Sequence, residues 1–273
     1  MKTGFFEAVA DCLALSEPVA KCTGVAELAD ALDRGLLDRG LLDQEAVSPV
    51  MPIGSPGRPL RPELVAAHKV PRRRLGSETG RAALVHAIAH IEFNAINLAL
   101  DAAYRFRGMP QQYYRDWISV AVDEARHFGL LQNRLKTLGS SYGEFPAHNG
   151  LWEMAEKTAD DCLVRMALVP RVLEARGLDV TPGMIERLRD IGDLETIAAL
   201  EVILAEEVRH VAIGTHWFRY CCERAGVEPL ATFLDLVREH YGSSLKGPFN
   251  LDARYEAGFT RDEMAALTAG LAA

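Results

Sequence analysis

Apolar residues recur at intervals of three and four along most of this chain, which is the spacing of one face of an α-helix. No stretch shows the strict alternation of apolar and polar residues that marks a half-buried β-strand. From Ser77 onward, long segments rich in alanine, leucine, isoleucine and glutamate follow one another with few breaking residues. The pattern predicts an all-α protein.

Capping and breaking residues place the ends of the expected helices. Ser77 is the expected N-cap of the first long helix, and Gly108 follows its end. Long helices are predicted over residues 77–106, 110–139, 149–177 and 194–225. Shorter ones are predicted within 5–45, at 183–192, at 229–241 and at the C-terminus, with the segment GLDVTPG separating the third long helix from the helix at 183–192. Helices of about 30 residues, each about 45 Å long, must bury an apolar stripe against partners. We therefore expect a four-helix bundle with additional N-terminal and C-terminal helices.

A segment rich in proline and glycine, SPVMPIGSPGRPLRP at residues 48–62, interrupts the helical pattern. It predicts an N-terminal helical extension and strap over residues 1–62. The bundle with its C-terminal helices is then expected over residues 63–273.

The composition indicates a soluble protein. The chain has 273 residues, 49% of them hydrophobic and 25% charged, and no apolar run approaches the about 20 residues that cross a membrane. Five cysteines without a CxxC pair suggest neither a disulfide framework nor a zinc or rubredoxin-type iron site. A cytoplasmic location and no membrane partner are expected. The net charge of −8 argues against nucleic acid as a general partner.

Two Glu-x-x-His motifs lie on different predicted helices. Glu124 and His127 belong to the second long helix, and Glu207 and His210 belong to the fourth. Residues three apart share a helix face, so each pair can direct a carboxylate and an imidazole at one point. One such motif is common by chance, whereas two on separate long helices indicate a metal site.

The other two long helices each supply a single inward carboxylate, Glu92 on the first and Glu174 on the third. Glu124 follows Glu92 by 32 residues, and Glu207 follows Glu174 by 33, as expected of two similar helix hairpins. Two single glutamates with two Glu-x-x-His motifs are the ligand set of ferritin-like di-iron and di-manganese proteins.

Helical phase places each acid within an otherwise apolar row. Buried carboxylates need counter-charge, which two divalent cations would supply. Ion pairs with Arg126 or Arg209 are the alternative source. His86 and His90 point away from Glu92 and are expected to pack or to form hydrogen bonds between helices. The predicted rows are Val85, Ile88, Glu92, Ile96 and Ala99; Trp117, Val120, Glu124, His127 and Leu131; and Thr196, Leu200, Ile203, Glu207, His210 and Gly214.

The ordered motifs HAIAHIEFNAINLALD, DEARHF, VPRVLEARGLDVTP, EEVRHVAIGTHWF and KGPFNLDARYEAGF resemble the ferritin-like proteins of domain-of-unknown-function family 455. The resemblance extends from about residue 60 to the end of the chain. It implies a ferritin-like bundle with a carboxylate-bridged di-iron site. By position it carries over as ligands Glu92, Glu124, His127, Glu174, Glu207 and His210. A more distant similarity is to the bacterial di-iron tRNA hydroxylase.

Carboxylates in excess over imidazoles favour two iron ions, with manganese or a mixed iron–manganese pair as alternatives. We expect an O₂-dependent oxidoreductase or hydroxylase acting on a small organic substrate and supplied by an external electron donor, since no CxxC electron carrier is fused to it. The alternatives are a ferroxidase, peroxide-scavenging or iron-handling protein, and a non-catalytic helical binding module. A homodimer is compatible with the additional segments. A tRNA substrate stays open by analogy alone.

Overall fold

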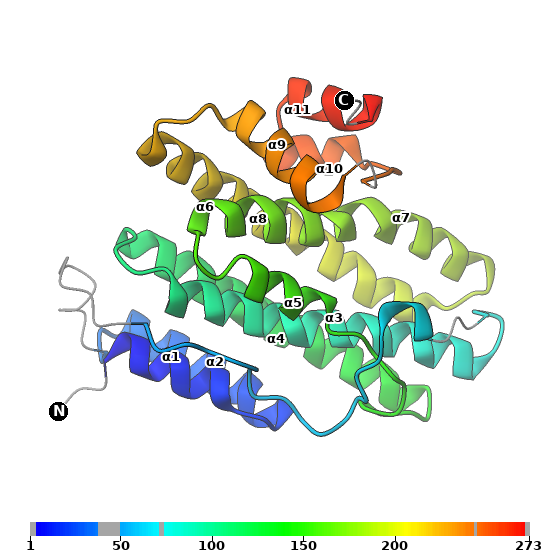
Figure 1. Ribbon diagram of the computed structural model, residues 1–273. Coiled ribbons are helices and arrows are strands. Elements are labelled where there is room, and N and C mark those ends of the chain that lie inside the picture. Colours follow the sequence, from blue (N-terminus) through cyan, green and yellow to red (C-terminus); the bar gives the residue numbers. More distant parts are fainter. Residues whose placement is uncertain (1–3, 38–49, 71–73, 243–244, 271–273) are drawn as a thin grey trace. The chain divides into compact units, whose positions relative to one another are not determined.

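Helices form the regular structure of this protein. The computed structural model describes residues 4–37, 50–70, 74–242 and 245–270, and no β-strand is found within those ranges (Figure 1). Leu64 and Ala147 form an isolated parallel bridge. The predicted all-α fold class is confirmed.

The chain folds as two compact units, residues 1–152 and residues 153–273. The boundary predicted at residue 62 rests on chain composition and stays a prediction. The first two residues of the predicted strap, 48 and 49, lie outside the described residues.

In the first unit, a long helical hairpin is covered by two shorter helices. The long helices α3 and α4 pack along each other, while α1 packs on α3 and α2 packs on α4. The segment before η1 is attached to α5 by a hydrogen bond, which the Trp152 indole N–H donates to the Gly54 carbonyl at 3.0 Å. The elements are α1 (Phe5–Ala14), α2 (Pro18–Asp33), the 3₁₀ turn η1 (Ala67–Lys69), α3 (Glu78–Arg105) and α4 (Gln111–Thr137), and α5 (Gly150–Lys157) begins in this unit.

Local signals fix the ends of these helices. Ser77 is the N-cap of α3, and its hydroxyl accepts from the Gly80 amide at 3.1 Å. Pro110 immediately precedes α4, and Gly139 follows it with a φ of 67°. The predictions for the first two long helices are therefore confirmed to within about two residues.

In the second unit, a long segmented helix packs along α8 (Figure 1). Because the connection from α7 to α8 is short, the two run antiparallel. Of the last three helices, α9 and α10 pack against α8, and α11 packs against α9. The elements are α6 (Cys162–Leu168), the π-helix η2 (Val169–Glu174), α7 (Ala175–Asp190), α8 (Leu194–Ala225), α9 (Pro229–Tyr241), α10 (Leu251–Glu256) and α11 (Arg261–Ala269).

The prediction of one helix over residues 149–177 is wrong in its interior. The helix is interrupted at residues 158–161, where Asp161 caps the start of α6 by accepting from the Leu163 and Val164 amides at 2.7 and 3.3 Å. A side chain that captures backbone donors in this way favours a new helix start over continuation.

The predicted separation at GLDVTPG is also wrong, since α7 continues through Pro182 and includes most of the helix expected at 183–192. Proline has no N–H, so Pro182 leaves the Leu178 carbonyl without its helical donor. The Asn250 side-chain amide donates to that carbonyl at 3.2 Å. A residue 72 positions away in the chain thus compensates for the proline.

Helix α3 is long and apolar enough to cross a membrane, alone among the helices within the ranges given above. In its most apolar window, 78% is buried inside the protein, as in the core helix of a soluble protein. The cytoplasmic location stays a prediction.

Candidate metal centre

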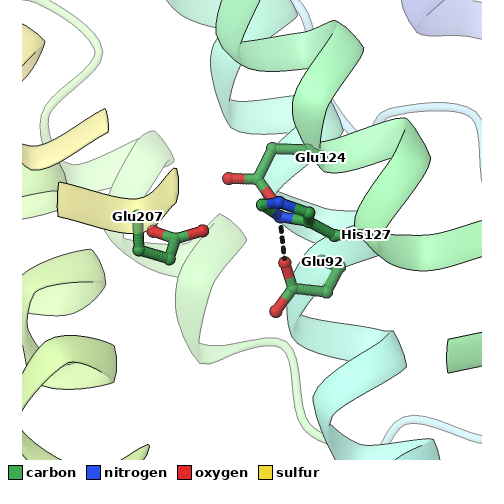
Figure 2. Close-up of side chains that lie close together, drawn as sticks. All are labelled: Glu92, Glu124, His127 and Glu207. Carbon is green, nitrogen blue, oxygen red and sulfur yellow. Dashed lines mark hydrogen bonds and ion pairs between the residues drawn. The ribbon is translucent and has the colours of Figure 1, made fainter. Parts of the chain in front are cut away.

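The first unit brings together three of the six predicted ligands. Glu92 projects from α3, and Glu124 and His127 project from α4 (Figure 2). His127 Nδ1 lies 3.3 Å from Glu92 Oε2 and 3.4 Å from Glu124 Oε2. One ligand atom from each of the three residues lies within 4.8 Å of the others, so the group could hold a metal ion.

Burial makes unpaired charge in this group costly. Glu92 is 4% exposed, and Glu124 and His127 are fully buried. Burial and the neighbouring Glu124 charge raise the pKa of Glu92 to about 8. Burial acts to lower the pKa of His127, but hydrogen bonds to Glu124 and Glu92 outweigh it and raise that pKa to about 10. The carboxylates therefore require a cation, either the protonated imidazole or a bound metal. The donor set fits a divalent ion.

The second unit contains a matching pair on α8. His210 Nδ1 lies 3.3 Å from Glu207 Oε1, and both side chains are buried. In each motif the imidazole thus presents Nδ1 to the glutamate three residues before it, at nearly the same distance. The two Glu-x-x-His motifs have the same local geometry.

Glu174 lies at the end of η2, on a face that packs against α8. The two helices approach closely at Pro170 and Gly214, where an added Cβ on the glycine would lie 2.2 Å from the Pro170 Cβ. Glu174 is about one π-turn after Pro170, and His210 is one α-turn before Gly214 on the antiparallel helix. The same two faces therefore carry Glu174 and His210. The π-helix could not be predicted from the sequence, although Pro170 in mid-helix was its one visible signal.

The three predicted inward rows are confirmed, because every member of each row is buried. Their role as metal ligands stays a prediction. His86 and His90 form hydrogen bonds away from Glu92, as expected. His86 Nε2 accepts from the Gly143 amide at 2.9 Å, and His90 Nδ1 lies 2.9 Å from the Tyr142 hydroxyl.

The alternative source of counter-charge, ion pairs with Arg126 or Arg209, stays a prediction. Arg126 reaches Asp123, with its guanidinium 3.5 Å from that carboxylate, and its side chain is 45% exposed. Arg209 is exposed.

One protein family matches most of this chain. Residues 14–265 match the family described as protein of unknown function (DUF455). A protein of Haemophilus influenzae, described as an uncharacterized protein, is 43% identical over 269 residues, which cover 96% of this chain and 93% of that protein. No solved structure matches.

Proposed function

This chain belongs to the family of proteins of unknown function DUF455, and we propose that it is a ferritin-like di-metal carboxylate protein holding two iron ions. The observation that carries the proposal is the repeated Glu-x-x-His geometry, once on α4 and once on α8. Each unit supplies one such pair and one further glutamate, Glu92 or Glu174. Two equivalent half-sites of this kind are what a di-metal centre needs.

In the proposed centre, Glu92, Glu124, Glu174 and Glu207 would hold the two ions through their carboxylates. His127 and His210 would complete the set with their imidazoles, whose Nδ1 atoms face a carboxylate in each motif. Oxygen and imidazole ligands with carboxylates in excess suit iron or manganese better than copper or zinc.

A pair of iron ions bound here would supply the binding and reduction of O₂ or peroxide. The chain's own part is to hold the ligands and to exclude water. Ile88 and Ile96 lie one turn to either side of Glu92, and Val120 and Leu131 lie on the row of Glu124, all of them buried. Such surroundings keep bulk water from the carboxylates. From this we propose an O₂-dependent oxidoreductase or hydroxylase of a small organic substrate, served by an external electron donor.

The experiment that tests the metal centre is metal analysis of the purified protein after anaerobic Fe(II) loading. Two iron or manganese ions per chain are expected in the wild type, with clear losses in Glu124→Ala and Glu207→Ala. Asp123→Asn is the matched control, because Asp123 is the neighbouring acid on α4 but lies off the buried row. Absence of bound metal in the loaded wild type would refute the proposal.

A second measurement tests the reaction. An oxygenase consumes O₂ only when both reductant and an organic substrate are present, so a panel of candidate substrates is screened for O₂ uptake by the loaded protein. Steady oxidation of excess Fe(II) with no organic substrate would identify a ferroxidase instead.

A further inference from the structure

A fully buried arginine lies on the π-helix that carries Glu174. Arg171 is three residues before Glu174, and its Nη2 donates to Glu263 Oε1 at 2.5 Å. Burial lowers the pKa of Arg171 to about 10, so the guanidinium remains charged at neutral pH. A charge this deep requires a specific partner, and Glu263 of α11 is that partner.

Aromatic rings enclose the rest of the guanidinium. Its central carbon lies 4.0 Å from the centre of the Phe233 ring and 4.6 Å from those of Phe218 and Phe259. The buried Nε and Nη1 groups have no hydrogen-bond acceptor among the described residues. The side chain is therefore held in one orientation by contacts from α8, α9 and the turn before α11.

Glu263 is itself fixed. Its Oε2 accepts from the Thr260 amide at 2.7 Å, and its own amide donates to the Thr260 hydroxyl at 3.1 Å, which makes a capping box at the start of α11. One carboxylate thus joins the N-terminus of a helix to the π-helix. Movement of α11 would be transmitted to Arg171.

A second buried pair in the same unit provides a comparison. Arg254 of α10 donates to both oxygens of Asp179 on α7, at 2.9 and 2.7 Å, and both side chains are buried. This pair resembles the first in charge, burial and distance between partners along the chain. It differs in that Asp179 lies on α7, outside the π-helix that carries Glu174.

We propose that Arg171 and Glu263 are positioning residues that hold η2 in its π conformation and thereby keep Glu174 on the face that packs against α8. The inference rests on the proposed function, in which Glu174 binds a metal ion. A buried ion pair is weak evidence for stability, because burying the two charges offsets most of their attraction. The positioning of Glu174 accounts better for the presence of the Arg171–Glu263 pair, since residues that orient metal ligands strongly affect metal affinity.

The test compares Glu263→Gln with Asp179→Asn, two isosteric changes that each remove one charge from a buried pair. Both variants are expected to lower the melting temperature. Only Glu263→Gln is expected to weaken the binding of one of the two metal ions, by about tenfold to a hundredfold in competition with a chelator. In a Glu174→Ala background, Glu263→Gln should cause no further loss of affinity.

A measurement on the metal-free protein keeps the two proposals apart. Faster amide hydrogen exchange at residues 171–176 in Glu263→Gln, with no such change in Asp179→Asn, supports the positioning role independently of metal. Equal metal affinity and equal exchange in the two variants would overturn it while leaving the metal centre intact. An equal loss of metal in Glu263→Gln and Asp179→Asn would also overturn the positioning role, because it would show that a general loss of stability weakens metal binding. A wild type that binds no metal would refute the proposed function itself.

Discussion

Gly214→Ala tests whether the close approach of α8 to η2 is a requirement of the fold. The added Cβ would lie 2.2 Å from Pro170 Cβ and 2.3 Å from Pro170 Cγ, whereas ordinary contacts begin near 3.4 Å. The proline ring cannot swing aside as a flexible side chain would, so the two helices must separate by about 1 Å. Overpacking of this kind costs about 1–3 kcal/mol. The gain in helix propensity from glycine to alanine offsets about 1 kcal/mol of that.

Gly177→Ala is the matched control, because Gly177 lies inside α7 of the same unit with no atom within 4 Å of its added Cβ. It should stabilise the protein by up to about 1 kcal/mol through propensity alone. The difference between the two variants is therefore about 1–3 kcal/mol, or about 2–4 °C in melting temperature for each kcal/mol. Thermal unfolding followed by circular dichroism measures it. A Gly214→Ala protein as stable as Gly177→Ala, with unchanged metal content, would refute the close-packing argument.

Three further substitutions follow from buried polar groups. Asn250→Ala removes the donor to the Leu178 carbonyl and the cap of α10, so chemical denaturation should show a free energy of unfolding lower by about 1–3 kcal/mol. A decrease of less than a few tenths of a kcal/mol would contradict the account of Pro182. Burial lowers the pKa of His86 from 6.5 to about 4, so the unfolded state binds a proton at a higher pH than the folded state does. The free energy of unfolding therefore falls, by about 3 kcal/mol at most, as the pH drops from 6.5 toward 4. His86→Gln should flatten that part of the stability profile, and an unchanged slope would show that other groups cause it. Glu92→Gln removes one of two adjacent buried carboxylates, so thermal unfolding should show the metal-free variant to be more stable by about 1 kcal/mol, whereas the variant should bind less metal than the wild type. A metal-free variant less stable than the wild type would contradict the inferred repulsion between the carboxylates.

The features that were predictable from the sequence depend on residues close together in the chain. Ser77 caps α3 with its own side chain, and Gly226 ends α8 with a φ of 67°. The inward row of Glu124 and His127 follows from helical periodicity alone. These signals need no knowledge of the rest of the fold, which explains why the long helices and the buried acids could be anticipated.

The features that were missed depend on distant partners. Pro182 is accommodated in α7 because Asn250 supplies a donor. The Arg171 side chain of η2 contacts Glu263 and three phenylalanines that lie at least 40 positions further along the chain. Neither partner is visible in the local pattern around the prolines. The interruption at residues 158–161 was also missed, because alanine and acidic residues there have no strong breaking signal apart from Asp161 as a cap.

The π-helix has a consequence for chain length. Each residue of an α-helix advances the side chains by about 100°, and a π-turn accommodates one residue more than an α-turn would. Deleting a single residue from 169–174 would let the segment return to the α form, and the side chains within it, those of Arg171 and Glu174 included, would then change their angular positions relative to α6 and α7. For this stretch of the protein, the number of residues is as strict a requirement as their identity, so insertions and deletions should be tolerated in the connecting loops but not here.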